Sequence, residues 1–461
     1  MISDPRKKES EQVASDLIDL ILSRVHSYCT ADPLADLTSR NKLEPYFEGS
    51  KEQFRVMSYN VMAHSLSHHN LENIKPFEER YLKWEYRSSL FLKEIRYYDP
   101  DILCLQEVDK DDNTIAAALQ DDYHIFYKSR TGDKGDGCMT LIKKSKYDII
   151  ERHFIEYFRD PNDPILNRDN VCIITVVKPK EGETKDLFFI ANTHILFSDN
   201  RGDIKTAQVT LALKALKKLS QAERFRGYHH HFFYMGDFNL LPNSGIYELL
   251  SKGRFDFREQ RCNLLTGQKL GALKNVDKFR SIEDFLIANI NHYRYDSRNI
   301  ENKRELLLQW LLYLKRIDVD VRVPVNDEPC QIGFVINDPP PEEINPLDES
   351  IYCLETDLRL LSTYGNFQKF YYGLKHQPFP SQFYLPKYST YEPVYTCRTI
   401  NSLMTVDYIW FSSASSNGNR KLRVRSVYEV PSYHKVKRVF YYPNRIFPSD
   451  HFSLIADFEL L

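Results

Sequence analysis

A carboxylate and a carboxamide stand two residues apart where an apolar segment ends. The run His231–Met235 leads into Gly236-Asp237-Phe238-Asn239. Alternate residues of an extended chain point the same way, so we expect Asp237 and Asn239 to face one site while Phe238 turns into the core. Such a pair suits a phosphodiester, because the carboxylate can orient or deprotonate a water and the amide can donate to a phosphate oxygen. Asp and Asn also form turns after strands, so this phrase alone leaves both interpretations open.

Other strand-like apolar runs carry the same kinds of polar side chain at their ends. Loops at strand ends on a rigid scaffold are where functional sites are commonly built. The polar residues that begin or end these runs are Asn60, Glu107, His194, Asp407, Asp450 and His451. Their recurrence favours the functional interpretation of Asp237 and Asn239.

Glu107 is the candidate metal ligand on residue type alone. It is a lone carboxylate with few Lys or His neighbours in the sequence, which favours a hard cation over zinc. Mg²⁺ is typically held by one or two carboxylates and keeps several waters, which leaves room for a phosphate. A strand-end glutamate paired with an arginine is the other interpretation.

In this order, the strand-end residues resemble the motifs of the endonuclease/exonuclease/phosphatase superfamily. The resemblance runs from about Phe54 to Leu460, with one long interruption. Four further phrases resemble the Angel, nocturnin and carbon-catabolite-repression deadenylase branch: Asp136–Cys138, Arg168–Val171, Arg201–Lys205 and Glu392–Thr396. The phrases Arg201–Lys205 and Leu265–Gln268 are similar to those of Angel-type proteins and their yeast relatives.

The resemblance implies a divalent metal ion and an activated water. Glu107 would hold Mg²⁺, with Asn60 and Asp450 as nearby ligands and Mn²⁺ as a substitute ion. Asp237 would orient and activate the attacking water. Stabilising the charge that builds on the phosphoryl oxygens is then the main task of the remaining residues.

The resemblance also implies which residues stabilise the charge on the phosphoryl oxygens. Asn239 and His194 would stabilise the developing charge together with the metal. His451 would contact a non-bridging oxygen, while Asp407 would fix the orientation of its ring and raise its basicity.

Three residues are candidates for substrate binding: Arg201, Lys205 and Asn170. Capping of the following helix is the other interpretation of Arg201 and Lys205. Related deadenylases usually carry a proline after the Thr-His pair that packs on a substrate base, and here Asp199 stands near that place. This departure weakens the expectation of strict adenine selectivity and leaves the phosphodiester chemistry intact.

The composition excludes a strongly basic nucleic-acid-binding protein. The 461 residues carry a formal charge of −2 and a pI near 6.7, so any basic footprint must be local. Residues 420–445 interleave basic and aromatic side chains, which suits either an RNA path or a solvated hairpin. The cysteines form no Cys-x-x-Cys pair, and no signal peptide or membrane-spanning run is recognisable. We therefore expect a cytoplasmic or nuclear protein with no membrane partner.

The order of apolar runs predicts the domain organisation. Residues 1–50 form an N-terminal extension with an amphipathic helix, and residues 51–461 form the catalytic domain. Helices are expected over Tyr81–Tyr98 and Ile204–Leu219, between strands that occur at both ends of the chain. The pattern suits an α+β fold, a four-layer α/β/β/α sandwich of two packed mixed β-sheets flanked by helices, which the resemblance also implies.

A long insertion at about 253–395 departs from this pattern. The pattern over Arg304–Ile317 predicts a helix, and Asp338–Glu343 form an acidic, proline-rich linker. We expect a partly ordered excursion from the sandwich. This insertion and the N-terminal helix are the candidate sites for a protein partner.

The expected function is a Mg²⁺-dependent phosphohydrolase that acts on RNA, as a 3′→5′ exoribonuclease trimming single-stranded 3′ ends. An RNA 2′,3′-cyclic phosphatase is the alternative within the enzyme class. A non-catalytic RNA-binding scaffold is the alternative outside it, and would require a damaged set of polar residues.

Overall fold

The computed structural model describes most of the chain. The described residues are 33–44, 52–67, 79–163, 165–181, 185–258, 265–268, 303–324, 328–337, 349–367, 391–393, 395–399, 403–415, 420–431, 436 and 442–461. The amphipathic helix expected in the N-terminal extension and the proline-rich linker lie outside these ranges. Each helix in the described ranges is too short or too polar to cross a lipid bilayer.

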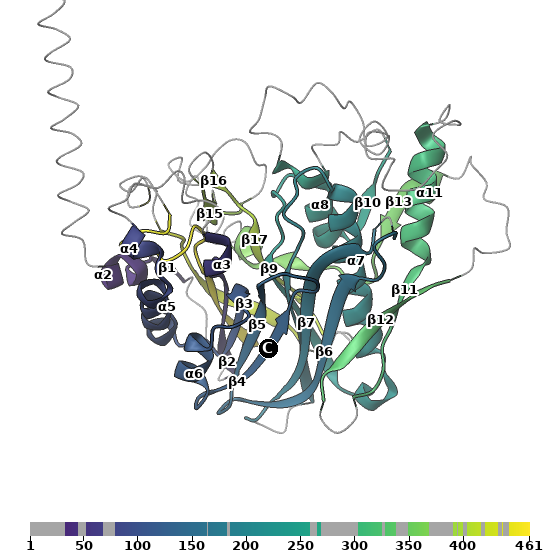
Figure 1. The fold of residues 1–461 in the computed structure, drawn as a ribbon. Coiled ribbons are helices and arrows are strands. Elements are labelled where there is room, and N and C mark those ends of the chain that lie inside the picture. Colours follow the sequence, from purple (N-terminus) through teal and green to yellow (C-terminus); the bar gives the residue numbers. More distant parts are fainter. Residues whose placement is uncertain are drawn as a thin grey trace, which may run out of the picture.

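Two large β-sheets pack face to face in the middle of the molecule (Figure 1). The first sheet has the strand order β1-β18-β19-β2-β3-β5-β4. Its strands are β1 (Lys42–Leu43), β2 (Gln53–Asn60), β3 (Ile102–Asp109), β4 (Tyr123–Ser129), β5 (Asp136–Lys143), β18 (Leu422–Tyr428) and β19 (Leu454–Leu460).

The second sheet has the order β11-β12-β6-β7-β8-β9-β17-β14. Its strands are β6 (Tyr147–Phe158), β7 (Asn167–Pro179), β8 (Asp186–His194), β9 (His229–Asp237), β11 (Ile317–Asp320), β12 (Cys330–Ile336), β14 (Leu361–Ser362) and β17 (Asp407–Phe411). Two short pairs stand apart, β10 (Arg254–Asp256) with β13 (Cys353–Glu355), and β15 (Cys397–Arg398) with β16 (Leu403–Met404).

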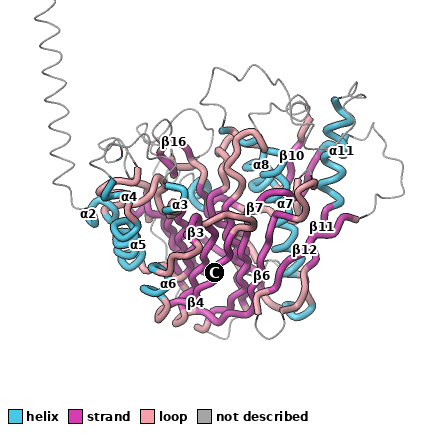
Figure 2. The backbone as a smooth tube through the Cα atoms, viewed as in Figure 1, coloured by secondary structure: helices cyan, strands magenta, loops and turns pink. Residues whose placement is uncertain are grey.

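Helices cover the outer face of each sheet, which Figure 2 shows as cyan segments on both sides of the magenta strands. On the first sheet lie α2 (Pro33–Thr38), α4 (Glu79–Leu82), α5 (Trp84–Tyr98) and α6 (Thr114–Leu119). On the second lie α7 (Gly202–Ser220), α8 (Gly245–Lys252) and α11 (Lys303–Arg316). Other short helices are α3 (His64–Ser67), η3 (Glu223–Phe225) and η8 (Glu349–Tyr352).

The alternation of side chains along each strand separates the core into layers. In β2, Val56 faces the space between the sheets, while the next residue, Met57, packs under α5. Phenylalanines fill the space between the sheets, where the rings of Phe54 and Phe188 lie 5.0 Å apart. The structure therefore confirms the predicted sandwich of two mixed sheets flanked by helices.

Described parts of the range 253–395 belong to this sandwich. Strand β12 pairs in parallel with β6, and β14 pairs with β17 at the other edge of the second sheet. Helix α11 buries Leu307, Trp310 and Leu311 in the core under the same sheet. Sequence reasoning found the helix but not these strands, because their partners are far away in the chain.

One glycine allows the strand that carries the Asp-Phe-Asn phrase to approach its neighbour. Gly236 has φ of +140°, and a Cβ atom at this position would lie 1.9 Å from the carbonyl oxygen of Thr193 on β8. Gly227 also has a positive φ, +86°, but a Cβ atom there would meet nothing within 4 Å. Substituting an alanine at each glycine would therefore distinguish the free-energy cost of a positive φ, which both positions share, from that of a steric clash, which only Gly236 would add.

We predict that Gly236→Ala lowers the free energy of unfolding by at least about 3 kcal/mol, because it combines a strained backbone with overpacking. Gly227→Ala, the matched control, should cost only about 1–2 kcal/mol, the penalty of a left-handed backbone. Urea unfolding of both variants measures the difference. Equal destabilisation would contradict the close approach of β9 to β8.

Candidate active site

Parallel pairing places four of the predicted residues at one end of the sandwich. Strands β2 and β3 run in parallel, so Asn60 at the end of β2 lies beside the Gln106-Glu107 end of β3. Strands β8 and β9 also run in parallel, and His194 is directly opposite Asp237 in their register. The ends of parallel strands meet at one sheet edge, so each sheet contributes a pair of polar side chains.

Antiparallel strands bring in Asp407 and the segment of Asp450 and His451. Asp407 begins β17 and is opposite Asp237 in the pairing with β9. Strand β19 pairs with β2, so the segment before it returns to the Asn60 end of the sheet. Ser449 fixes this segment, because its Oγ donates to the carbonyl oxygen of Asn60 at 2.8 Å and accepts from the backbone N–H of His451 at 3.1 Å.

Asn60 joins the two sheets at the centre of the site. Its Nδ2 donates to Glu107 Oε1 and to Asp237 Oδ2, both at 3.0 Å. Its Oδ1 accepts from the backbone N–H of Met62 at 2.9 Å. Asn60 therefore presents its amide nitrogen to the carboxylates in this structure, and its predicted role as a metal ligand remains a prediction.

Three non-glycine residues at the site have a positive φ, and this strained backbone orients their side chains. Glu107 has φ of +56° and lies where the β3–β5 register shifts between Leu105 and Val108, and such bulges re-aim side chains. Asn239 and Met62 have φ of +48° and +53°. Non-glycine residues adopt this conformation rarely, and clusters of such strain are typical of functional sites.

His451 and Asp407 form a buried pair. Nδ1 of the ring lies 2.9 Å and 3.1 Å from the two carboxylate oxygens of Asp407. Burial lowers the pKa of His451, but the charge of Asp407 more than offsets it and raises the pKa well above its usual value. Nε2 of the ring is left to face Asp237 Oδ2, at 3.8 Å. The pairing agrees with the orienting role expected for Asp407.

Carboxylates converge on the same space. Asp237 is 2% exposed, and burial together with the charge of Asp407 raises its pKa well above its usual value. Burial also raises the pKa of Asp450, with a contribution from the charge of Glu107. Oxygen donors that repel one another in this way suit a hard divalent cation. The residues present therefore fit a divalent metal ion, and Glu107, His194 and Asp237 bring their donor atoms within 4.8 Å of one another. The predicted ligand set of Glu107, Asn60 and Asp450 and the identity of the ion as Mg²⁺ stay predictions.

His194 is held as a neutral ring. Burial lowers the pKa of its imidazole to about 4. Its Nε2 lies 3.5 Å from Asp237 Oδ2 and 3.2 Å from Asn239 Nδ2. Asn239 also donates from Nδ2 to the carbonyl oxygen of Ile195 at 3.1 Å. Phe238, between the two functional residues, is fully buried against Tyr234, which confirms that it turns into the core.

The three candidate substrate-binding residues make internal contacts. Asn170 donates from Nδ2 to the carbonyl oxygen of His194 at 2.9 Å, and Arg201 forms a buried pair with Asp203 at 2.8 Å. Lys205 is fully buried, and its Nζ lies 2.5 Å from the carbonyl oxygen of Asn239. Asn170 and Lys205 thus support the backbone of the site, and a direct contact with substrate stays a prediction.

Sequence reasoning did not identify Arg87 as part of the site. The side chain of Arg87 is fully buried beneath the site. Its Nη1 donates to the carbonyl oxygens of Val61, Met62 and Pro448 at 2.9, 2.8 and 3.2 Å. Burial lowers the pKa of Arg87 to about 10, against the opposing charges of carboxylates that include Glu107. The available signal was an arginine in the apolar pattern of the 81–98 helix.

Thr396, in the Glu392–Thr396 phrase, also has a supporting role that the sequence did not reveal. Its Oγ1 accepts from the backbone N–H groups of Val406 and Asp407, both at 3.0 Å. Its carbonyl oxygen accepts from the backbone N–H of Phe452 at 2.7 Å. Thr396 therefore holds the segment of Asp407 next to the segment of His451.

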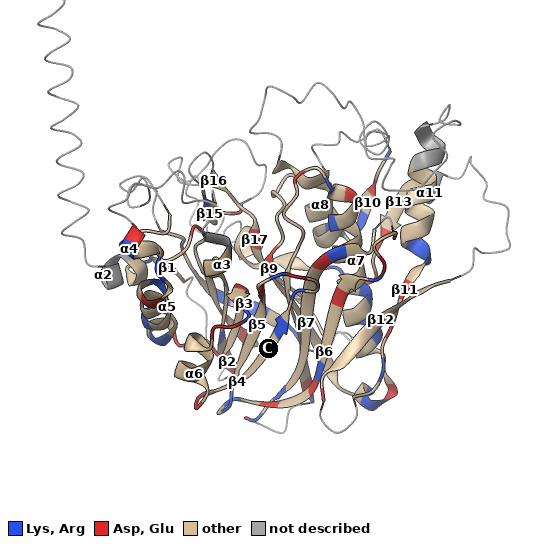
Figure 3. Ribbon diagram, in the orientation of Figure 1, with Lys and Arg blue, Asp and Glu red and all other residues tan. Residues whose placement is uncertain are grey.

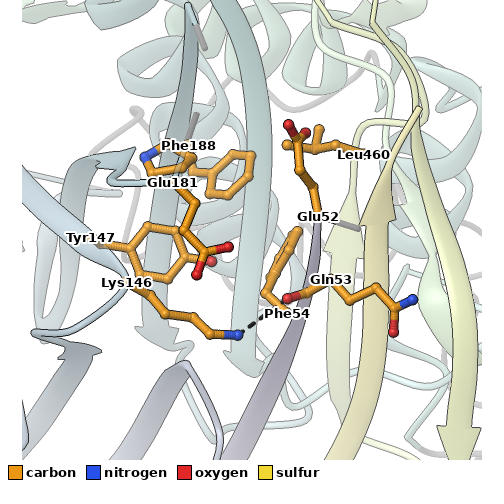
Figure 4. A pocket seen from close by; sticks show the side chains of 9 residues that line it. Glu52, Gln53, Phe54, Lys146, Tyr147, Glu181, Phe188 and Leu460 are labelled. Atoms are coloured by element: carbon orange, nitrogen blue, oxygen red, sulfur yellow. Dashed lines mark hydrogen bonds between the residues drawn. The ribbon is translucent and has the colours of Figure 1, made fainter. Parts of the chain in front are cut away.

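A small cavity lies at the opposite end of the same strands (Figure 4). Phe54 and Phe188, near the starts of β2 and β8, line it, and Lys146 donates to the carbonyl oxygen of Gln53 at its mouth, at 3.2 Å. Its volume of about 40 Å³ is far below that of small-molecule sites, about 300–1,000 Å³. This cavity is too small to hold a nucleotide.

Three arginines in the described part of the basic stretch 420–445 pair with acidic residues. Arg420 pairs with Glu52 at 2.6 Å, Arg423 with Glu459 at 2.6 Å, and Arg425 with Glu44 at 3.1 Å. Figure 3 shows acidic and basic residues interspersed over the outer helices and strand ends. Lys435, Lys437 and Arg438 lie outside the described residues, so the predicted RNA path along this stretch remains a prediction.

Comparison with known proteins identifies relatives of the chain. Residues 57–451 match the Endonuclease/Exonuclease/phosphatase family. Protein angel homolog 2 of Bos taurus is 35% identical over 233 residues, which cover 49% of this chain and 42% of that protein. Protein angel homolog 1 of Rattus norvegicus is 27% identical over 454 residues, which cover 90% of this chain and 64% of that protein. The chain thus spans less than two thirds of the length of either relative.

A solved structure shares the fold over almost the whole chain. The crystal structure of ANGEL2, described as a 2′,3′-cyclic phosphatase, superimposes with a TM-score of 0.63 and 26% identity, covering 91% of this chain and 97% of that one. These matches confirm the Angel-type branch that the phrases Arg201–Lys205 and Leu265–Gln268 indicated. The chain therefore belongs to the Endonuclease/Exonuclease/phosphatase family.

Proposed function

We propose that this protein is a divalent-metal-dependent hydrolase of phosphodiesters at the 3′ ends of RNA. The observation that carries the proposal is the position of Asp237. Its buried carboxylate lies within 3.8 Å of both His194 Nε2 and His451 Nε2, and Asn60 links it to Glu107. A carboxylate among these donors is suited to activate a water beside a phosphate whose oxygens need stabilisation.

Each residue then has a distinct task. Asp237 accepts a proton from the attacking water, and its raised pKa makes it a better base than an ordinary aspartate. His451, charged through its pairing with Asp407, donates from Nε2 to a non-bridging phosphate oxygen. Asn239 donates the second hydrogen of Nδ2 to another phosphate oxygen. Its backbone N–H donates to Asp237 Oδ1 and its Nδ2 donates to the carbonyl oxygen of Ile195, and these two bonds hold it in place.

Mg²⁺ is the metal that the donor set favours. Glu107 and Asp450 would hold it, with Asn60 beside them, and Mn²⁺ would substitute. When bound, the ion neutralises charge on the phosphate oxygens and the leaving oxygen. Chelation should therefore abolish turnover, and Ca²⁺ should support binding better than turnover.

Two RNA substrates remain in competition. The sequence analysis favours exonucleolytic removal of 3′ nucleotides, whereas the similarity to ANGEL2 favours opening of a 2′,3′-cyclic phosphate. Both reactions break a P–O bond by attack of water, so the same residues serve either. A non-catalytic scaffold is disfavoured, because the eight polar positions remain intact and converge. We place the activity in the cytoplasm or nucleus, where RNA is present.

One assay separates the two substrates. Purified protein with Mg²⁺ is given a 5′-labelled A₂₀, a mixed 20-mer with a 3′-hydroxyl, and the same 20-mer ending in a 2′,3′-cyclic phosphate. A ladder of shorter products identifies an exoribonuclease. A product of unchanged length that has lost its cyclic end identifies a cyclic phosphatase. Binding without any product would favour the scaffold and overturn the proposal.

We predict that Asp237→Asn lowers the hydrolysis rate by at least about 10²-fold, because it removes a single catalytic base while keeping the size of the side chain. Unfolding temperature and circular dichroism should show a folded variant. Asp318→Asn, which alters a partly exposed ion pair on β11, serves as the control and should retain wild-type activity. Activity of Asp237→Asn within a few-fold of wild type would contradict its assignment as the base.

Glu107→Gln should raise the Mg²⁺ concentration needed for half-maximal rate by about tenfold or more, because the ion loses a charged ligand. The rate is measured against Mg²⁺ concentration at saturating RNA. Glu223→Gln, on an exposed side chain of η3, is the control and should leave this concentration unchanged. An unchanged metal requirement in Glu107→Gln would place the ligand elsewhere.

A further inference from the structure

A thiol lies beside two residues of the candidate active site. Cys397 begins β15, is 3% exposed and belongs to a buried cluster with Leu241 and Val406. Its Sγ, a carboxylate oxygen of Asp450 and a ring nitrogen of His451 all lie within 4.8 Å of one another. A buried free cysteine usually packs as a small apolar side chain. The two polar neighbours of Cys397 give its thiol a chemistry that packing alone does not use.

Backbone pairing holds the thiol against the imidazole. Cys397 and His451 are directly opposite each other in an antiparallel bridge. The two backbone hydrogen bonds that flank this pair are both 2.7 Å long, Arg398 N–H to the carbonyl oxygen of Asp450 and Phe452 N–H to that of Thr396. Opposite residues flanked in this way form a non-hydrogen-bonded pair, in which the side chains of two strands come closest. The thiol and the imidazole therefore lie side by side.

Asp407 leaves one ring nitrogen of His451 available. The carboxylate lies 2.9 Å from Nδ1, whereas Nε2 lies 4.0 Å from Asp450 Oδ1. A carboxylate on one nitrogen of a histidine ring orients the other nitrogen towards a metal ion and makes it a stronger ligand, and this arrangement is common around zinc. The pair of Asp407 and His451 can therefore serve a metal ion as well as a phosphate.

The three donor groups differ in kind from those that suit Mg²⁺. A thiolate, an imidazole and a carboxylate are the ligands that Zn²⁺ takes in proteins, whereas Mg²⁺ takes oxygen ligands. Three protein ligands leave the fourth position of a tetrahedral ion for a water. The side chain of Asp450 is 21% exposed, so an ion can enter from solvent on this side.

We propose that Cys397, His451 and Asp450 form an inhibitory site for Zn²⁺. The inhibition rests on the proposed function, because it acts on groups that the hydrolysis uses. Zn²⁺ replaces the proton of the Cys397 thiol and the proton on His451 Nε2, and both protons pass to solvent. Nε2 then has no hydrogen to donate to a phosphate oxygen, and Asp450 is withdrawn from Mg²⁺. A thiolate-seeking ion thus switches off a reaction that depends on an oxygen-seeking one.

The first test measures how Zn²⁺ inhibits hydrolysis. The substrate is the RNA 20-mer that wild type hydrolyses, at saturating Mg²⁺, and each rate is divided by the rate of the same variant without Zn²⁺. Wild type should lose activity at Zn²⁺ concentrations far below that of Mg²⁺. Cys397→Ala should raise the half-inhibiting concentration by at least about tenfold, since even groups that only support a metal ligand contribute this much to affinity.

Matched variants separate metal binding from packing. Cys397→Ser keeps the size of the side chain but offers a poor zinc ligand, so it should raise the half-inhibiting concentration as Cys397→Ala does. Cys353→Ala removes another thiol that is 3% exposed, on β13, and should leave this concentration unchanged. An unchanged concentration in both Cys397 variants would overturn the inference, as would hydrolysis supported by Zn²⁺ in place of Mg²⁺.

A spectroscopic test makes the result independent of turnover. Co²⁺ takes the ligands of Zn²⁺, and a thiolate ligand gives it a charge-transfer absorption band in the near ultraviolet. Wild type titrated with Co²⁺ should show this band, and added Zn²⁺ should abolish it. The band should be absent from Cys397→Ser and present in Cys353→Ala.

The two tests fail in different ways. A band that persists in Cys397→Ser would place the ion at another thiol and overturn the inference. Absence of RNA hydrolysis by wild type would instead overturn the proposed function, and the Co²⁺ band would still decide whether Cys397 binds a metal ion.

Discussion

The contact on which the site depends is made by Asn192, which is fully buried on β8 between the two sheets. Its Nδ2 donates to the carbonyl oxygens of Leu105 and Met139, at 3.2 and 2.9 Å, and its Oδ1 accepts from Gln106 Nε2 at 2.9 Å. The rest of the layer between the sheets is largely apolar, and apolar contacts are non-directional. Asn192 therefore fixes how one sheet is registered on the other.

That registration has a direct chemical consequence. Glu107 and Asn60 come from the first sheet, whereas Asp237 and His194 come from the second. A slide of one sheet over the other would separate the carboxylates that Asn60 now links at 3.0 Å. A buried amide that loses its partners costs about 1–3 kcal/mol, so the hydrogen bonds of Asn192 resist such a slide. The position of the catalytic groups is thus a property of sheet packing.

Several features of the site lower the stability of the fold. Buried acidic groups with raised pKa values, positive φ at Glu107 and Asn239, and a fully buried Arg87 are each unfavourable in isolation. Hydrogen bonds that Ser449 and Lys205 donate, and one that Thr396 accepts from the backbone N–H of Asp407, hold the segments of the site in place. Of these supporting residues, Ser449 stands directly before Asp450 and His451 in the sequence, whereas Thr396 and Lys205 are distant in sequence from the residues that they hold.

Local sequence pattern indicated which polar residues stand at strand ends, and the resemblance to the superfamily gave them their expected roles, which stay predictions. Asp237 and Asn239 could be recognised because a strand ends there, and the two-sheet fold followed from apolar runs at both ends of the chain. The support given by Arg87 and Lys205 could not be predicted, because it depends on backbone carbonyl groups that only the folded chain brings near. The same holds for β12, whose pairing with β6 joins segments that are far apart in sequence.

The position of β19 has a consequence for how the chain acquires its chemistry. This strand, at residues 454–460, lies between β18 and β2 and is the path by which His451 reaches Asn60. During synthesis, β2 emerges from the ribosome hundreds of residues before β19, and Asp237 is made long before His451. The groups of the site can therefore come together only after β19 has been synthesised and has inserted between β18 and β2.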